Sequence, residues 1–374
     1  MSNIQGTHTE APAEVGLLTS RANTAAAALT MPSLAKTQDV TLKLQAVWSE
    51  NSVLHEFAVD YVNIVNTIAA GRVRLEMLPR GAVVSRGGDL QGAVASGALD
   101  AAHGVASNQY AKDKAYGLFT TPPSFGWNSM QMLGWMRHGG GQALYDDLVQ
   151  KVHGKNITGF LLGPMPTQPL GWFKKPIHSP DDLKGLKFRT GGLSADVHRI
   201  LGMEPVLIPG NETAEALASG RVDAAEYLNP TIDRQVGLSK AAPIYIVQGY
   251  HQVCECFEII YNKSRLDELG DEVKRILEIA GDAASSSMLY KQMAYYPRDL
   301  EQIKAVDKVT VVRAPDSILD AQLAAWEKVI EDLSSDPFFK KVIESQRAWT
   351  KSVVGFDVEW EAPRDRAFAF FNKS

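Results

Sequence analysis

The 374-residue sequence has few cysteines and no long apolar run. Its two cysteines, Cys254 and Cys256, would share one face of a strand, where a disulfide between them would be badly strained. No stretch approaches the ~20 apolar residues that a membrane-spanning helix needs. These absences exclude a disulfide framework and give no sign of a transmembrane helix.

The familiar catalytic and nucleotide-binding motifs are also missing. The sequence contains no GxSxG, no HExxH, no P-loop, and no GxGxxG after a strand. The glycines at 139–141 lack the Lys-Ser/Thr pair of a phosphate-binding loop, and the eight histidines do not fall at metal-ligand spacings. These absences lower the expectation of an enzyme without excluding one.

The charge balance is mildly acidic. Thirty-eight basic and 43 acidic residues give a formal net charge of -5, and no basic stripe stands out. Such a chain has no general attraction for nucleic acid or anionic membrane. An anionic ligand would therefore need a local cation.

Residues 25–35 are small and mostly apolar and end in Ser33 and Ala35, side chains of the size that signal peptidase prefers. The segment before them contains glutamates and is a poor positively charged leader. The alternative is a disordered, tag-like N-terminus. We interpret residues 1–38 as a processed or truncated export signal outside the fold.

Hydrophobic periodicity predicts a β-helix-β unit at the start of the fold. Residues 42–48 alternate as a half-buried strand, an amphipathic helix over 54–69 follows a cap at Asn51 or Ser52, and 73–77 alternate again. Such a unit indicates a parallel sheet with helices on its faces. Further strands are expected at 157–163, 187–190, 257–261 and 309–312, and further helices at 273–284 and 319–333.

One short pattern occurs twice. Residues 95–103 read ASGALDAAH and residues 218–226 read ASGRVDAAE, each as a helix end, a glycine cap and a short strand. The repeat predicts two domains of similar plan. Because ligands bind beyond the carboxyl ends of parallel strands, His103 and Glu226 are expected to face a site.

Arg189 is the best candidate for binding an anion. It ends the expected strand 187–190, before two glycines and Ser194, which can cap a helix. A guanidinium beside a helix N-terminus can hold a carboxylate through two hydrogen bonds. The alternative is a surface arginine paired with an aspartate.

Glu226 poses a problem for an anionic ligand. At 4 Å and an effective dielectric near 20, two like charges repel by about 4 kcal/mol. Glu226 therefore binds something cationic, or a metal ion bridges it to the ligand. The alternative is a glutamate that caps a helix or pairs with an arginine.

Amides and aromatic residues could complete the site. The Gln168 side chain can donate to a carboxylate and offer oxygen to a hard cation, although a loop glutamine is usually solvated. Trp172 is expected to pack in the core. Further wall candidates are Asn108, Gln109 and Tyr110, with Gln252 a weaker one.

From about residue 40 to its end, the chain resembles the extracytoplasmic solute receptors of TRAP transporters. The similar stretches are HGGGQALYDDL, QPLGWFKKPI, DLKGLKFRTGGLSADVHRILG, ALASGRVDAAEYLNP and AAPIYIVQGY. HGGG and GWFKK are most similar to the branch that binds 2-oxo acids.

The resemblance implies an α/β, two-domain periplasmic-binding-protein-like fold with an interdomain ligand cleft and a C-terminal helical extension. The expected domains are 39–164 plus 253–300, and 165–252 plus 301–374 with the C-terminal helices. The two domains would close on the ligand like a hinge.

The resemblance also implies the function. The chain would be an exported, periplasmic receptor, not an enzyme, that passes a 2-oxo acid or related monocarboxylate to integral-membrane permease subunits. Arg189 would pair with the carboxylate, and sodium or calcium would bridge the ligand to Gln168, Glu226 and Tyr227, with no organic cofactor. A homodimer would form through the C-terminal helix.

Four positions depart from that branch. Asn108 and Gln109 stand in place of tyrosines, Tyr227 in place of tryptophan and Gln252 in place of glutamate. The pocket would be more polar on one wall and less negative. Two alternative functions are an enzyme that uses Glu226 as a base near His103, and a sensory binding module.

Overall fold

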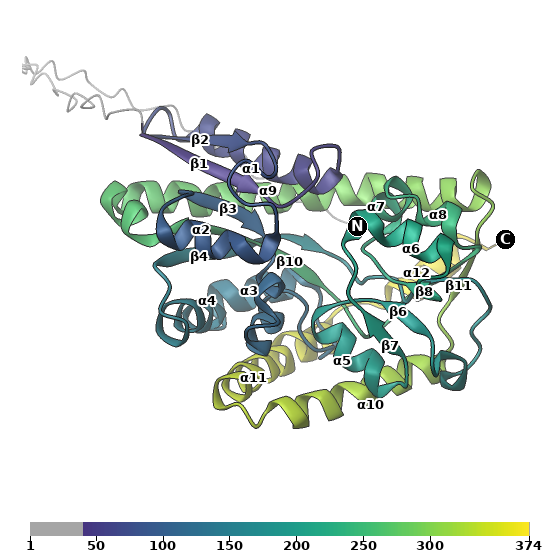
Figure 1. Cartoon of the computed structure of the whole chain (residues 1–374). Helices are drawn as coiled ribbons and strands as arrows, with labels where there is room; N and C mark the ends of the chain where they lie inside the picture. The colour runs from purple at the N-terminus through teal and green to yellow at the C-terminus, as the bar shows by residue number, and fades with distance from the viewer. Residues whose placement is uncertain (1–39, 374) are drawn as a thin grey trace, which may run out of the picture. The chain divides into compact units, whose positions relative to one another are not determined.

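The computed structural model describes residues 40–373, so the expected export signal at 1–38 lies outside the described residues. Its strands form two β-sheets, and its helices lie around them (Figure 1). None of the helices in residues 40–373 is both long and apolar enough to cross a membrane.

The first sheet has five strands in the order β2-β1-β3-β10-β4. The expected opening unit is confirmed: β1 and β2 are parallel and joined by α1 (Val53–Ile68). Ser52 is the cap, because its hydroxyl accepts a hydrogen bond from the Leu54 amide. The strands are β1 (Val40–Ala46), β2 (Val73–Leu78), β3 (Ala101–Gly104), β4 (Ile157–Met165) and β10 (Glu255–Asn262).

The second sheet has six strands in the order β11-β9-β5-β8-β6-β7. Strand β6 pairs in parallel with β7 and β8, whereas β5 is antiparallel to β8 and β9. The strands are β5 (Gly171–Phe173), β6 (Lys187–Arg189), β7 (Glu204–Val206), β8 (Ala224–Ala225), β9 (Ile244–Val247) and β11 (Thr310–Arg313).

The repeated sequence pattern forms the same structure in both sheets. Gly97 ends α2 (Leu90–Ser96) with φ 79°, and Gly220 ends α6 (Thr213–Ser219) with φ 80°. A left-handed backbone costs glycine little, because glycine has no Cβ. The chain then enters β3 of the first sheet and β8 of the second.

The chain crosses between the sheets three times: from β4 to β5, from β9 to β10, and through α9 (Lys263–Ala305) to β11. The backbone N–H of Gln168 donates to the backbone carbonyl oxygen of Gln252 at 3.0 Å. This hydrogen bond joins the first two crossings. Helix α9 contacts β4 and α1 near the first sheet and α7 near the second (Figure 1). The expected domain boundaries themselves stay a prediction.

The remaining helices complete the layers around the sheets. Helix α10 contacts α5, and α11 contacts α3 and α4, so the C-terminal helices extend from one sheet's helices to the other's. Their bounds are α3 (Ser129–His138), α4 (Gly141–Asp146), α5 (Gly192–Ile200), α7 (Pro230–Gln235), α8 (Leu238–Ala241), α10 (Asp316–Leu333), α11 (Pro337–Trp360) and α12 (Arg364–Phe371).

Both cysteines are free, as expected, and both are buried. Three histidines are also buried: His103, His198 and His251. The rings of His198 and His251 lie 4.9 Å apart, centroid to centroid. Burial disfavours the charged imidazolium, so the pKa of His103 is lowered to about 3, that of His198 to about 4, and that of His251 well below its usual range.

These histidines should make the protein less stable in mild acid. Below about pH 6.5 the unfolded chain binds protons that the folded imidazoles refuse, so each histidine lowers the free energy of unfolding as the pH falls toward 4. Each contributes a slope of up to about 1.4 kcal/mol per pH unit. We expect His198→Asn to flatten the dependence measured by urea unfolding between pH 7 and 4.5.

Comparing His198→Asn with the wild type isolates the contribution of His198. Buried carboxyl groups contribute slopes of opposite sign, but they are the same in the wild type and in the variant. The substitution His138→Asn, at an exposed histidine of α3, controls for the general effect of losing an imidazole. An unchanged slope in His198→Asn would mean that this imidazole takes up its proton equally in both states.

Candidate functional site

A cavity of about 230 Å³ lies where strands of both sheets end. Its walls come from the residues after β1, β3, β6 and β8 and from the start of β10. This is the position where ligands bind in open α/β sheets. The lining residues are Trp48, Val105, Ser107, Asn108, Thr121, Gln168, Arg189, Gly191, Gly192, Leu207, Glu226, Tyr227, Leu228, Gln252, Glu255 and Phe257.

Arg189 is held firmly at the end of β6. Its Nε donates to the carbonyl oxygen of Ile208 at 3.1 Å, and its Nη1 donates to that of Glu226 at 2.8 Å. The Tyr227 ring packs on the guanidinium, 4.9 Å from its central carbon. Within residues 40–373 no hydrogen bond uses Nη2, so this nitrogen can bind a ligand.

The helix after Arg189 begins differently from the sequence prediction. Gly191 is the N-cap of α5, and Ser194 lies one turn inside, so the prediction that Ser194 caps the helix is wrong. The Ser194 hydroxyl instead accepts a hydrogen bond from the Thr190 hydroxyl at 3.1 Å. The two glycines start the helix early, and this places their backbone in the cavity wall.

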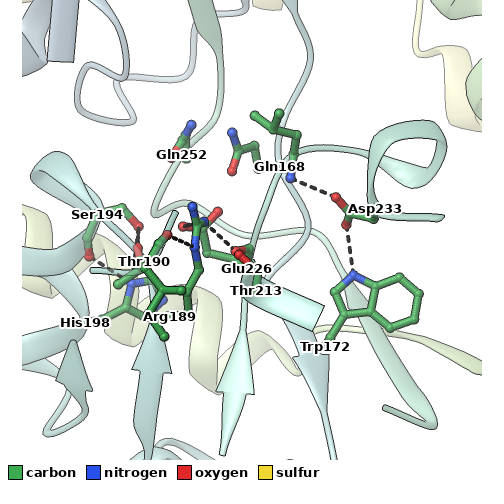
Figure 2. A network of polar contacts seen from close by, with 12 residues as sticks. Gln168, Trp172, Arg189, Thr190, Ser194, His198, Thr213, Glu226, Asp233 and Gln252 are labelled. Atoms are coloured by element: carbon green, nitrogen blue, oxygen red, sulfur yellow. Dashed lines mark hydrogen bonds and ion pairs between the residues drawn. The ribbon is translucent and has the colours of Figure 1, made fainter. Parts of the chain in front are cut away.

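Glu226 lies at the end of β8 and is 3% exposed. Its Oε1 is 3.6 Å from Nη1 of Arg189, so one alternative considered from the sequence, an arginine partner, is present (Figure 2). Burial raises the pKa of Glu226 to about 7, although Arg189 acts to lower it. The Arg189 charge therefore does not fully offset the cost of burying the charged Glu226 carboxylate.

Glu255 is a second buried carboxylate of the cavity, and the sequence analysis missed it. It begins β10 and accepts hydrogen bonds from Nε2 of Gln168 at 2.8 Å and from Nε2 of Gln252 at 3.3 Å. Burial raises its pKa to about 8. Its place in the mostly apolar run CECFEIIY, residues 254–261, was a signal that could have indicated Glu255.

The cavity has the oxygen atoms that a hard cation requires. Gln168 is 1% exposed and gives its Nε2 to Glu255, and its Oε1 has no hydrogen-bond partner in the described part of the chain. An orphaned amide oxygen beside two carboxylates and one guanidinium fits sodium or calcium. Within residues 40–373 no group of three or more His, Cys, Asp or Glu side chains could hold a metal, so such a site would need this amide.

Most of the predicted site residues come together in the cavity. Figure 2 shows Gln168, Arg189, Glu226 and Gln252 in one view. Arg189 and Glu226 lie at strand ends, and the two glutamines lie in the crossings between the sheets. Trp172 packs in the core as expected: it is fully buried, stacks on Tyr245 and donates to Asp233. The predicted residues that line the cavity are Asn108, Gln168, Arg189, Glu226, Tyr227 and Gln252.

Gln109 and Tyr110 do not line this cavity. The backbone forms a 3₁₀ turn at Ala106–Gln109, so successive side chains point in different directions and only Asn108 of these three reaches the wall. Gln109 donates to the Gly88 carbonyl at 3.0 Å. The Tyr110 hydroxyl donates to Asp196 of α5.

His103 also lies outside the lining. Its Nδ1 accepts a hydrogen bond from the Trp48 indole at 2.8 Å, and its ring packs against Phe257. The imidazole therefore supports two aromatic residues of the wall from behind. The expectation that His103 faces the site is corrected, because the aromatic side chains cover it.

Known proteins are similar to this chain in sequence and in fold. The family model of DctP, the bacterial extracellular solute-binding proteins of family 7, matches residues 44–340. A monocarboxylate 2-oxoacid-binding periplasmic protein of Nostoc sp. is 31% identical over 288 residues, which are 77% of this chain and 78% of that protein.

Two solved structures are similar over most of their length. A TRAP transporter solute-binding protein from Bordetella bronchiseptica, a dimer with copurified calcium and picolinate, is 26% identical with a TM-score of 0.80, covering 89% of this chain and 96% of that one. A TRAP periplasmic solute-binding protein from Colwellia psychrerythraea, with bound calcium and pyruvate, is 25% identical with a TM-score of 0.79, covering 89% and 99%.

These similarities confirm the α/β fold with its C-terminal helical extension. They also confirm that the chain is a binding protein rather than an enzyme, because the matched family consists of solute receptors. The chain belongs to the DctP family, the bacterial extracellular solute-binding proteins of family 7.

Proposed function

We propose that this chain captures a small organic carboxylate, with 2-oxo acids as first candidates, and delivers it to the membrane subunits of a TRAP transporter. The observation that carries the proposal is Arg189. Its guanidinium is anchored to two backbone oxygens and retains a free donor in a cavity between the two sheets. The Nostoc relative, named for binding 2-oxo acids, supports this ligand class.

A cation would complete the site. One guanidinium faces two buried carboxyl groups, Glu226 and Glu255, whose raised pKa values show that burial disfavours their charged forms, and an anionic ligand alone would disfavour them further. Sodium or calcium bound by these carboxyl groups and by Oε1 of Gln168 would favour the charged forms. Calcium in the two similar structures supports this.

Tyr227 would contribute through its backbone. The phenol extends toward Gly210, where an added Cβ would collide with the Tyr227 hydroxyl. The Tyr227 carbonyl oxygen, next to Glu226 in the chain, would then join Gln168 and Glu226 around a cation.

The proposal is tested by calorimetric titration of the protein with pyruvate and longer 2-oxo acids. Parallel titrations contain sodium, calcium, or neither ion with a chelator present. We expect saturable binding that requires one of the cations, with the acid recovered unchanged. If no carboxylate binds under any of these conditions, the proposal is wrong.

We also propose that two copies associate through the C-terminal helices. The end of α11 and all of α12 expose large apolar side chains, which in soluble proteins mark interaction surfaces. Light scattering should give a dimer mass for the protein and a monomer mass for Trp360→Glu/Phe368→Glu. A monomeric wild type at 10 µM would contradict this. The exposed side chains are Phe356, Val358, Trp360, Phe368, Phe370 and Phe371.

The periplasmic location is part of the same proposal. The family consists of extracellular solute-binding proteins, which supports export of this chain. Export signal cleavage within residues 1–38 would be checked by sequencing the N-terminus of the exported protein, and an intact Met1 there would contradict it.

A further inference from the structure

A neighbouring cavity adjoins the one that contains Arg189. This second cavity, of about 410 Å³, shares Trp48, Asn108 and Tyr227 with the first. Because the same three side chains line both cavities, the two are neighbours, and we call these side chains the partition. A ligand whose acid end is at Arg189 and whose chain is longer than that of pyruvate would extend past the partition.

The second cavity has a wall of mixed polarity and one formal charge. Apolar side chains, among them Val47, Leu54 and Ile232, line it together with hydroxyl and amide groups from the segment before α1 and from the second sheet's side. Arg80 is its single charged side chain among the described lining residues, and no carboxylate lines it. The polar lining residues are Ser49, Asn51, Ser52, Asn211 and Gln235.

Arg80 is positioned to bind an anion. It follows β2, and its Nε donates to the carbonyl oxygen of Val47 at 3.0 Å, which anchors the guanidinium beside the partition. In the described part of the chain, Nη1 and Nη2 of Arg80 make no hydrogen bond and no ion pair. These two nitrogens offer the planar arrangement that binds a carboxylate through two hydrogen bonds.

We propose that the second cavity binds the distal end of the ligand, that this end carries a second carboxylate, and that the ligand is a 2-oxo dicarboxylic acid. This inference rests on the proposed function, which places the first carboxylate at Arg189. A hydroxylated tail would find hydroxyl and amide partners in the wall but would leave the Arg80 charge without a partner. A carboxylate would pair with the Arg80 guanidinium, and the methylene groups before it would pack on the apolar part of the wall.

Two five-carbon acids test the inference, since 2-oxopentanedioate and 2-oxopentanoate share the same acid end and differ in the distal carboxylate. Each is titrated calorimetrically into the full chain at low salt with saturating calcium. We expect the diacid to bind about tenfold more tightly, because its distal carboxylate makes charge-assisted hydrogen bonds to Arg80 where the monoacid has only a methyl group. Raising the salt should reduce this preference, because Arg80 is exposed.

The variant Arg80→Gln keeps a donor and removes the charge. It should bind the diacid about tenfold more weakly than wild type and leave the monoacid's affinity unchanged. Arg86→Gln is the matched control, because Arg86 is exposed, is paired with Asp89 and does not line the cavity. It should leave both affinities unchanged.

The outcomes separate this inference from the proposed function. The inference of a second carboxylate is wrong if wild type binds the two acids equally or if the preference for the diacid survives in Arg80→Gln. Either result leaves the proposed receptor function standing. Tighter binding of a five-carbon polyhydroxy acid than of the diacid also overturns the inference. If neither acid binds wild type, both the function and the inference fail.

Discussion

Arg189→Ala is expected to lose at least about thirtyfold in affinity for the carboxylate ligand. Truncating one partner of a buried, hydrogen-bonded charge pair costs about 2–5 kcal/mol, and tenfold in affinity is about 1.4 kcal/mol. The Arg189 side chain is 12% exposed, so solvent can do little to replace it. Isothermal calorimetry with saturating cation would measure the loss.

The same substitution should also lower the stability of the ligand-free protein. Arg189 satisfies the backbone oxygens of Ile208 and Glu226, and each buried group left unpaired costs about 1–3 kcal/mol. Arg189→Lys is the control, because it keeps the charge near Glu226 but cannot reproduce the planar contacts. It should retain more stability than the alanine variant and still bind the acid weakly. Wild-type affinity in Arg189→Ala would remove this residue from the site.

Glu255→Gln is expected to weaken the cation site, so that acid binding requires a higher calcium concentration than in the wild type. Changes to groups that only support metal ligands already cost 10–100-fold in metal affinity, so loss of a direct carboxylate ligand should cost at least about tenfold. The amide is similar in size and can still accept from Gln168, so the cavity should keep its shape. Titrations at increasing calcium concentrations would measure the shift.

Glu258→Gln provides a matched control on the same strand. Glu258 is also buried, but it accepts a hydrogen bond from the Tyr145 hydroxyl at 2.6 Å and does not line the cavity. This variant should be less stable yet keep the wild-type response to calcium. If Glu255→Gln keeps that response too, Glu255 is not a cation ligand.

The secondary structure around the site was largely predictable because its signals are local. The alternation in 42–48 and the helical spacing in 54–69 appear as β1 and α1, and Gly97 and Gly220 end their helices in the left-handed conformation that the repeat predicted. Such patterns depend on neighbouring residues and backbone sterics, which a sequence contains directly.

The composition of the site was less predictable. Glu255 was missed because its importance comes from Gln168, 87 residues earlier in the chain. Gln109 and Tyr110 are adjacent to Asn108 in sequence, but a 3₁₀ turn directs them to Gly88 and Asp196. Proximity in sequence does not decide which side chain faces a cavity.

From the sequence alone followed the β-helix-β opening, the paired helix-glycine-strand units and the arginine at the end of a strand. All of these depend on residues close together in the chain. Only the tertiary structure decided that Glu255 joins Arg189 and Glu226 in one cavity and that Arg80 lies in the next. Side chains from several strands meet there only after both sheets and their crossings have formed, because burial and charge pairing depend on the packed chain.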